Sequence, residues 1–122
     1  MNQVISILEK AADLIESGHL VKNMAADNRG GYCSVGALRK AGGEVQDLHD
    51  WFWRREEVLQ DAALVLYNKG VAPKLGNPAT NDWQIAWGRV VQWNNAPERT
   101  AAEVVEAMKQ AAKELSNGAT PL

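Results

Sequence analysis

The chain has 122 residues, a length that fits one domain with its own core, and no stretch approaches the ~20 apolar residues that a membrane-spanning helix needs. Thirteen basic and fifteen acidic residues give a net charge of -2, and the basic residues are spread along the chain, which disfavours a nucleic-acid partner. The single cysteine excludes an internal disulfide and a cysteine-based metal cluster.

The first predicted element is an amphipathic helix over residues 3–17. Its apolar residues recur at the spacing of one helix face, and charged residues occupy the other face. Gly18 can adopt a left-handed conformation and is predicted to end this helix. Residues 19–32 are predicted to form a connector, with a turn at the Asp-Asn-Arg-Gly-Gly sequence of residues 27–31.

A short helix of small, apolar residues is predicted over residues 33–41, ending at Gly42-Gly43. Gly36 and Ala37 would let another helix approach closely, so we expect a central, buried position. The next predicted helix covers about residues 48–69, with a break near Trp53-Arg54 left open and an end at Gly70. Residues 71–80 contain two prolines and a glycine and are expected to form a loop.

Thr80 or Asn81 is expected to cap a further helix, whose face would carry Trp83, Trp87, Val90 and Val91, although the β-branched pair leaves a strand open. The sequence of residues 93–97 is predicted to break this pattern.

Thr100 and Glu103 have the spacing of a capping box, in which each side chain pairs with a free backbone amide of the other's turn. They predict the start of the last helix, which Gly118 would end. The fold class predicted from these elements is all-α. It is a compact single domain of four to five helices over residues 1–118, followed by a loose tail at 119–122. We expect the first and last helices to pack together over residues 33–38.

Three segments together resemble a known family: residues 8–18, the Cys-Ser-Val-Gly-Ala-Leu sequence that begins residues 33–41, and the Trp-Asn-Asn-x-x-x-Arg-Thr-x-x-Glu-Val sequence of residues 93–104. That family consists of small bacterial and phage proteins, common in actinobacteria, and is classed as a domain of unknown function. Its pattern usually has Asp where Asn95 stands, and the match is weak between about residues 44 and 80. The resemblance implies a shared fold and a phage or prophage origin, and it supplies no catalytic residue.

Cys33 is the main candidate for chemistry, because a thiol at the start of a helix can be activated by the backbone amides there. A nucleophilic cysteine needs a base, and the two histidines, His19 and His49, are the candidates. The alternative is that Cys33 is a small buried hydrophobic residue, the commonest state of a free cysteine. Two histidines with scattered carboxylates make a poor ligand set, so neither a metal nor another cofactor is expected.

Five tryptophans in 122 residues are well above ordinary usage, and for the group as a whole both a core position and an interface position are open. Three consecutive aromatic residues, Trp51, Phe52 and Trp53, cannot all face one core, so we favour an interface there. The residues predicted to bind a partner are Trp51, Phe52, Trp53, Arg54, Arg55, Trp93 and Asn94.

The function favoured by these features is a non-enzymatic protein-binding module, phage-encoded and acting on a host protein or as a homodimer. The alternative is a small-ligand-binding protein or cysteine-dependent enzyme with a pocket near Cys33, His19 and Trp93. The N-terminal sequence lacks the features of a secretory signal, so we expect a cytoplasmic protein, or one in the host cytoplasm if phage-encoded.

Overall fold

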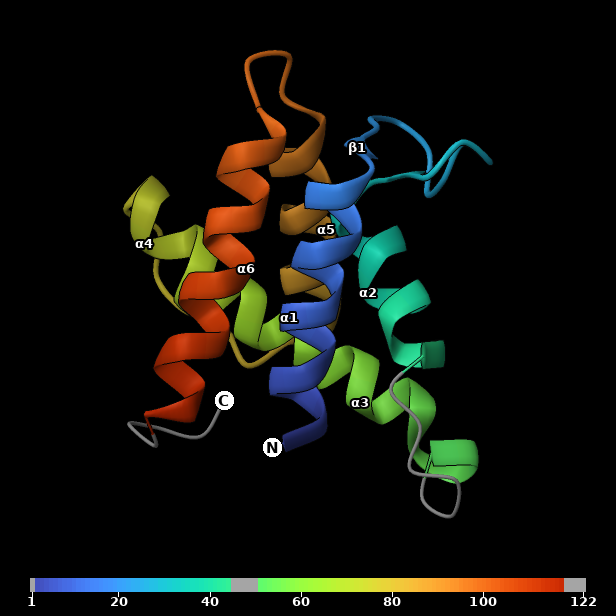
Figure 1. The fold of residues 1–122 in the computed structure, drawn as a ribbon. Coiled ribbons are helices and arrows are strands. Elements are labelled where there is room, and N and C mark those ends of the chain that lie inside the picture. The colour runs from blue at the N-terminus through green and yellow to red at the C-terminus, as the bar shows by residue number, and fades with distance from the viewer. Residues whose placement is uncertain (1, 45–50, 118–122) are drawn as a thin grey trace.

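The computed structural model describes residues 2–44 and 51–117 (Figure 1). Five helices of 11 to 16 residues account for most of this part of the chain, which confirms the predicted all-α class. The elements in chain order are α1 (Asn2–Ser17), β1 (His19–Leu20), β2 (Gly31–Tyr32), α2 (Ser34–Glu44), α3 (Trp51–Val65), the π-helix η1 (Leu66–Val71), α4 (Ala72–Leu75), α5 (Trp83–Asn95) and α6 (Ala101–Ser116).

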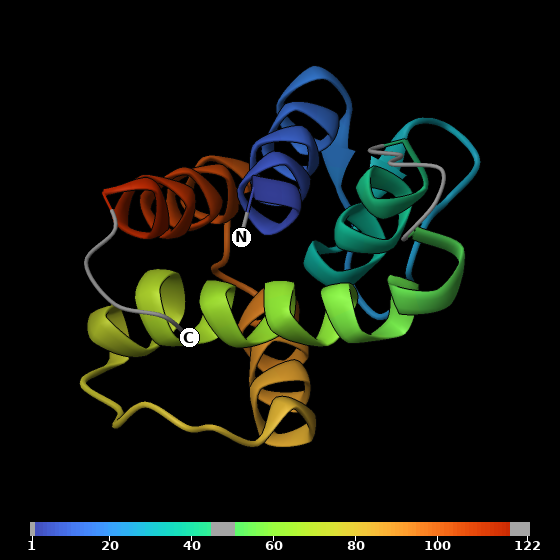
Figure 2. The ribbon, with the colours of Figure 1, turned by 90° about the horizontal axis from the view of Figure 1, so that it is seen from below.

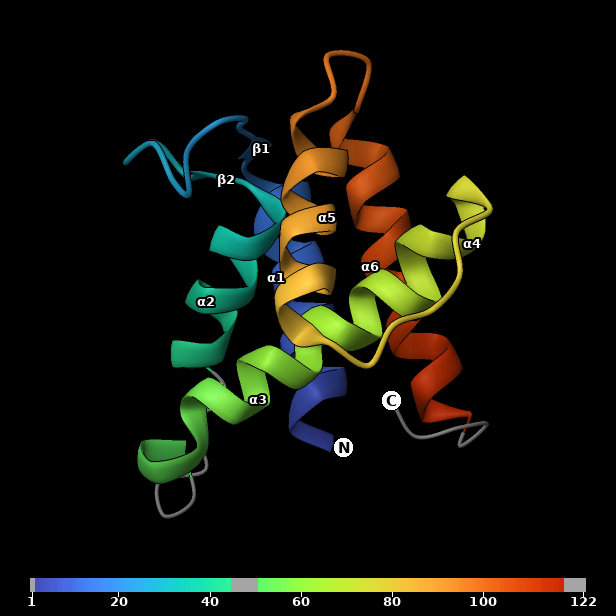
Figure 3. The same ribbon diagram turned by 180° about the vertical axis from the view of Figure 1, so that it is seen from behind.

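The helices form two layers. Seen from below, α6, α1 and α2 lie side by side, and the run from α3 to α4 crosses beneath them together with α5 (Figure 2). From behind, α5 is in front, and α2 lies beside it with the opposite chain direction (Figure 3). The predicted packing of the first helix against the last is confirmed by the contact between α1 and α6.

Helix α1 is the central element of its layer. We expected the segment at residues 33–38 to lie beneath both terminal helices, but it packs on the other side of α1 from α6. The reason is the width of the apolar stripe on α1, which is broad enough to cover two neighbours. The buried residues of that stripe are Val4, Ile7, Leu8, Ala11, Ala12 and Ile15.

Two glycines are required by close backbone approach. Gly18 follows α1, but its φ is not in the left-handed region as we expected; instead a Cβ there would lie 1.9 Å from the carbonyl oxygen of Gly30. This contact brings β1 beside β2, which form a short parallel pair. At Gly36 a Cβ would lie 2.0 Å from the carbonyl oxygen of Ala25, so its close neighbour is the connector and not, as predicted, another helix.

The helical path continues past both of the glycine ends that were predicted for the second and third helices. Helix α2 passes through Gly42-Gly43 to Glu44, since glycine lowers helix stability by only ~1 kcal/mol and a buried helix tolerates that. Helix α3 has no break at Trp53-Arg54, and Gly70 does not end it. The helical path continues through η1, where a Cβ at Gly70 would lie 2.4 Å from the Ala107 carbonyl oxygen of α6.

Half of the loop predicted at residues 71–80 is therefore helical. Pro73 lies in the first turn of α4, where its missing N–H costs no hydrogen bond. Gly76, with φ of 70°, provides the left-handed end that we had assigned to Gly70.

Asp82, and neither Thr80 nor Asn81, caps α5: its carboxylate accepts hydrogen bonds from the amides of Gln84 and Ile85. Helix α5 then continues through Val90-Val91, which excludes the strand alternative, and includes Trp93, where we expected a break. The predicted capping box of Thr100 and Glu103 is present at the start of α6. Gly118 and the tail at 119–122 lie outside the described residues.

None of the helices in the described ranges combines the length and the apolar composition that crossing a bilayer requires.

Candidate binding site

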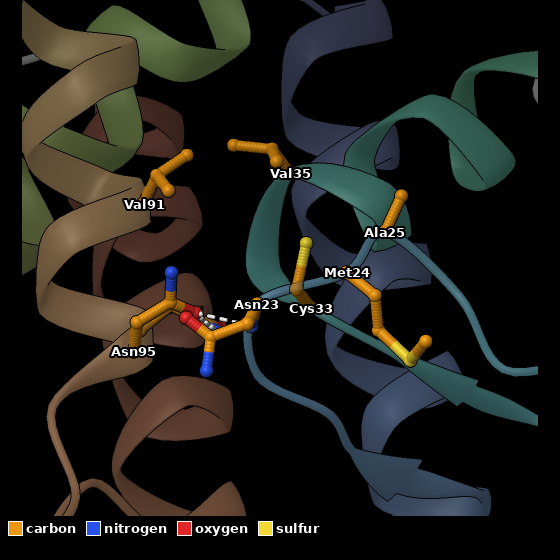
Figure 4. Close-up of a pocket in the computed structure, with 8 residues that line it drawn as sticks. Asn23, Met24, Ala25, Cys33, Val35, Val91 and Asn95 are labelled. Carbon is orange, nitrogen blue, oxygen red and sulfur yellow. Dashed lines mark hydrogen bonds between the residues drawn. The ribbon is translucent and has the colours of Figure 1, made fainter.

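A pocket of about 410 Å³ lies where the connector, the start of α2 and the last turns of α5 meet (Figure 4). Its walls are mostly apolar, and amide side chains lie along one edge. Figure 4 shows Val91 and Asn95 on the α5 side, facing Val35 and Cys33 across the opening. The residues that line the pocket are Asn23, Met24, Ala25, Cys33, Val35, Val91, Asn94 and Asn95.

The buried side chain of Asn94 joins all three walls of this pocket. Its Oδ1 accepts hydrogen bonds from the Ser34 amide (2.8 Å) and the Ser34 hydroxyl (2.6 Å), which satisfies the N-terminus of α2 from α5. Its Nδ2 donates to the carbonyl oxygen of Val21 in the connector and to Oδ1 of Asn95. The hydrogen bonds of Asn94 therefore hold the pocket in place and leave none of its groups free for a ligand.

Asn95 completes the same network with one atom. Its Oδ1 accepts a hydrogen bond of 2.9 Å from the amide of Asn23, a residue held at the positive φ of 63°. A carboxylate oxygen at this position would accept the same bond. Within the described residues, Nδ2 of Asn95 makes no hydrogen bond, and the side chain is only half-buried.

Cys33 is the residue before α2, and its thiol lines the pocket. The side chain is 7% exposed, and the amide of Gly36 donates a hydrogen bond to Sγ at 3.3 Å. The described residues that line this pocket include no histidine, carboxylate or amine beside the thiol. Their mostly apolar side chains suit the pocket to binding by apolar contact.

The two histidine candidates are not brought to Cys33. His19 does not line the pocket; its Nε2 lies 2.5 Å from Oδ2 of Asp27, within the connector. His49 lies outside the described residues. Across the part of the chain that the structure describes, no three potential ligands come together in a group that could hold a metal ion.

Asp27 organises the turn predicted at residues 27–31. Its Oδ1 accepts hydrogen bonds from the amides of Arg29 and Gly31, and the hydrogen bond with His19 is made by the other oxygen. These bonds favour the charged form and lower the pKa of Asp27 to about 2, the Arg29 amide contributing most. The pKa of Glu103 is also lowered, first by the hydrogen bond from the Thr100 amide and further by the nearby Arg99 guanidinium.

Trp93 is packed behind the pocket and does not line it, with 4% of its surface exposed. The guanidinium of Arg99 stacks on its ring at 4.6 Å and donates through Nε to the Trp93 carbonyl oxygen. Nη1 of Arg99 donates to Oε2 of Glu103 at 2.8 Å. The Trp-Asn-Asn-x-x-x-Arg-Thr-x-x-Glu sequence is thus one contact network that joins α5 to α6. Trp93 and Asn94, which were predicted to bind a partner, make their contacts within the protein.

A second candidate surface lies where α2, α3 and α5 meet, and we call it the aromatic face. Trp83 is 36% exposed there, and Trp87, one turn further along α5, is covered by the guanidinium of Arg39 at 5.2 Å. These side chains surround a pocket of about 270 Å³. The residues of the aromatic face are Arg39, Glu56, Leu59, Gln60, Trp83 and Trp87.

The predicted contact segment adjoins this face in the backbone. Residues 51–55 form the start of α3, directly before Glu56, and the side chains of Trp51, Phe52, Trp53, Arg54 and Arg55 lie outside the described residues. The sequence did not indicate that this end of α3 lies near Trp83, because the two are about thirty residues apart in the chain. Glu56, the next residue of α3, lines the same pocket as Trp83.

The sequence matches the profile described as "Family of unknown function (DUF6197)" over residues 1–114. The chain belongs to this family. The resemblance drawn from the three sequence segments is confirmed at that level. No curated protein and no solved structure matched the DUF6197 chain in the same comparisons.

Most residues of the pocket lined by Cys33, called the Cys33 pocket below, were not predicted as site residues from the sequence. Cys33 and Asn94 were predicted, whereas Met24, Val35 and Val91 carry no polar or catalytic group that would mark them. Met24 is 52% exposed, but it is followed by two alanines and has no distinguishing neighbours in the sequence.

Proposed function

We propose that this DUF6197 protein is a non-enzymatic binding module that contacts another protein through the aromatic face. The observation that carries the proposal is the exposed Trp83 beside the Arg39–Trp87 stack, around a pocket large enough for a partner side chain. Tryptophan and arginine are the residue types most enriched among interface residues that dominate binding energy.

The residue types at the start of α3 give the proposal a second support. Two further tryptophans, a phenylalanine and two arginines are contributed by residues 51–55, which join the aromatic face at Glu56. The face carries both Arg39 and Glu56, so a partner with an apolar side chain flanked by charges of both signs fits it best. A cytoplasmic location and an origin in a bacterium or phage remain predictions from the sequence and its resemblance.

The test is photo-crosslinking in the native bacterial host, with a photoreactive phenylalanine at Gln60 on the aromatic face. The matched control carries it at Gln110, on the exposed side of α6. We expect a discrete adduct from position 60, its loss in the Trp83→Ala background, and no such adduct from position 110. Truncation of a central interface tryptophan costs at least about 2 kcal/mol, so affinity should fall roughly thirtyfold.

The mass of the adduct separates the two kinds of partner. An adduct that contains a different protein supports the proposal. An adduct of twice the mass of this chain would instead identify a second copy of the chain as the partner. The absence of any adduct from position 60, or the same adduct from position 110, would overturn it. Trp51→Ala and Trp53→Ala in the same assay extend the test to the start of α3. Their melting temperatures separate an interface, which leaves melting unchanged, from a core.

A further inference from the structure

The Cys33 pocket has the dimensions and chemistry of a small-molecule site that is distinct from the aromatic face. Its volume of about 410 Å³ falls within the range of ~300–1,000 Å³ that is typical of ligand pockets. The two sites share no described lining residue, and the Arg39–Trp87 stack is the part of the aromatic face nearest to this pocket. Arg39 follows Val35 by one turn of α2, and Trp87 precedes Val91 by one turn of α5.

The lining excludes a charged ligand. Cys33, Val35, Val91, Ala25 and Met24 supply apolar walls, and among the described residues that line the pocket there is no Lys, Arg, Asp, Glu or His. An ion that entered would lose hydration without gaining an opposite charge, which is costly in an apolar site. The occupant must therefore be uncharged over the part that enters.

One edge of the pocket offers a hydrogen-bond donor to a ligand. Oδ1 of Asn95 is occupied by the Asn23 amide and by Nδ2 of Asn94, and this fixes the plane of the Asn95 amide. Nδ2 of Asn95 is thereby held at the pocket edge with its hydrogens unused by the described residues. A ligand carbonyl or hydroxyl oxygen would accept from it.

The site is already formed without a ligand. Asn94 ties α5 to the start of α2, and the Cys33 amide donates to the Ala25 carbonyl oxygen at 3.0 Å, which fixes the connector wall. At the mouth, Met24 has a flexible thioether side chain that can adapt to ligands of different shape. A preformed site loses little conformational freedom on binding.

We propose that the Cys33 pocket binds a small, uncharged and mainly apolar molecule that offers one oxygen acceptor to Nδ2 of Asn95. This ligand function is independent of the protein interface proposed above. The thiol of Cys33 contributes to the apolar wall and forms no covalent bond.

The experiment is an NMR titration of the ¹⁵N-labelled protein with four probes of similar size. Acetophenone is neutral and has an acceptor, ethylbenzene is neutral without one, benzoate is an anion, and benzylammonium is a cation. We expect saturable shifts from acetophenone at the amides of Met24, Cys33 and Val91 and at the Asn95 side-chain amide. Ethylbenzene should bind about tenfold more weakly, as expected for one lost hydrogen bond, and the two ions should cause no saturable shift there.

Two pairs of variants locate the site. Val91→Phe places a ring in the pocket and should abolish the acetophenone shifts, whereas Gln92→Phe, at an exposed neighbouring position of α5, should leave them unchanged. Asn95→Asp keeps an acceptor for the Asn23 amide but removes the donor, so acetophenone should bind about tenfold more weakly. Asn95→Gln retains the donor group, so acetophenone should bind this variant more tightly than Asn95→Asp.

The proposal is overturned if benzoate or benzylammonium binds as well as acetophenone, if Val91→Phe leaves the shifts intact, or if none of the four probes produces saturable shifts at the pocket. Each variant's ¹⁵N spectrum reports on folding in the same experiment. If Val91→Phe does not fold, its loss of binding carries no information, and the comparison of Asn95→Asp with the wild type is used instead. Failure here leaves the crosslinking result at the aromatic face unaffected, because the residues probed there line a different pocket.

Discussion

Asn94 shows how one buried polar side chain can connect three segments that are far apart in the sequence. Its 1% exposure would be costly for an amide with unpaired groups, but each of its two polar atoms makes two hydrogen bonds. The partners lie in α2, the connector and α5. Asn94 was predicted as a partner-binding residue, and its contacts place it in the internal structure of the Cys33 pocket.

We expect Asn94→Ala to lower the free energy of unfolding by about 2–4 kcal/mol, because it leaves buried groups of Ser34 and Val21 without partners. Asn68→Ala is a matched control: its amide also exchanges two hydrogen bonds, both with Thr80, but at a half-buried site. This control should lose about 1 kcal/mol. Urea unfolding of the two variants measures the difference, and an equal loss in both would refute the central role of Asn94.

At the scale of the elements, glycine has two opposite roles in these helices. Gly70, in η1, lets the backbone of this segment approach α6 closely at Ala107. Gly88, within α5, is exposed and has open space where a Cβ would lie. Gly70 was predicted to end its helix, but the helical path continues past both glycines.

These roles predict opposite effects of one substitution. Gly88→Ala should raise the free energy of unfolding by about 0.5–1 kcal/mol, since alanine has the higher helix propensity and meets no obstacle. Gly70→Ala should lower it by about 1–3 kcal/mol, because the new methyl group collides with a backbone oxygen that must shift. Thermal unfolding followed by circular dichroism tests both, and stabilisation by Gly70→Ala would contradict the close packing of η1 on α6.

The whole molecule depends on contacts between helices that are distant in the chain. Helix α1 joins α6 to α2, η1 packs on α6, and the network of Trp93 and Arg99 joins α5 to α6. The connector has few regular backbone bonds and is held by side chains, chiefly Asp27 and Asn95. The connector is therefore the part of the molecule whose stability is most sensitive to the protonation of a carboxylate.

We expect the free energy of unfolding to fall as the pH is lowered from about 5 towards 2. A carboxyl group whose pKa is depressed in the folded state stabilises the fold above its unfolded pKa, and that stabilisation is lost as the pH falls through the folded value. For Asp27 this interval runs from the ordinary 3.8 to about 2, and Glu103 acts in the same direction. Denaturant unfolding at several pH values gives the free energy of unfolding as a function of pH. This free energy should change less with pH in Asp27→Asn than in the wild type, and an equal change would refute the assignment to Asp27.

The helical class, the family membership and the apolar faces of the terminal helices could all be predicted from the sequence. These depend on local properties: the 3.6-residue period of apolar residues in α1 and α6, and the capping box formed by Thr100 and Glu103, residues three apart in the chain. The same local reasoning identified Cys33 as buried. It misplaced helix ends at Gly42-Gly43 and Gly70, because the contacts that carry the helix past them come from other elements.

The positions of the candidate sites follow from tertiary packing, and the sequence pattern did not reveal them. The Cys33 pocket combines the connector, α2 and α5, and its apolar residues have no property in the sequence that distinguishes them from the core. The aromatic face likewise joins α3 to α5. A binding site depends on which surfaces remain open after the helices pack. Local propensities leave that packing undetermined, since it follows from the fit of side chains separated by tens of residues.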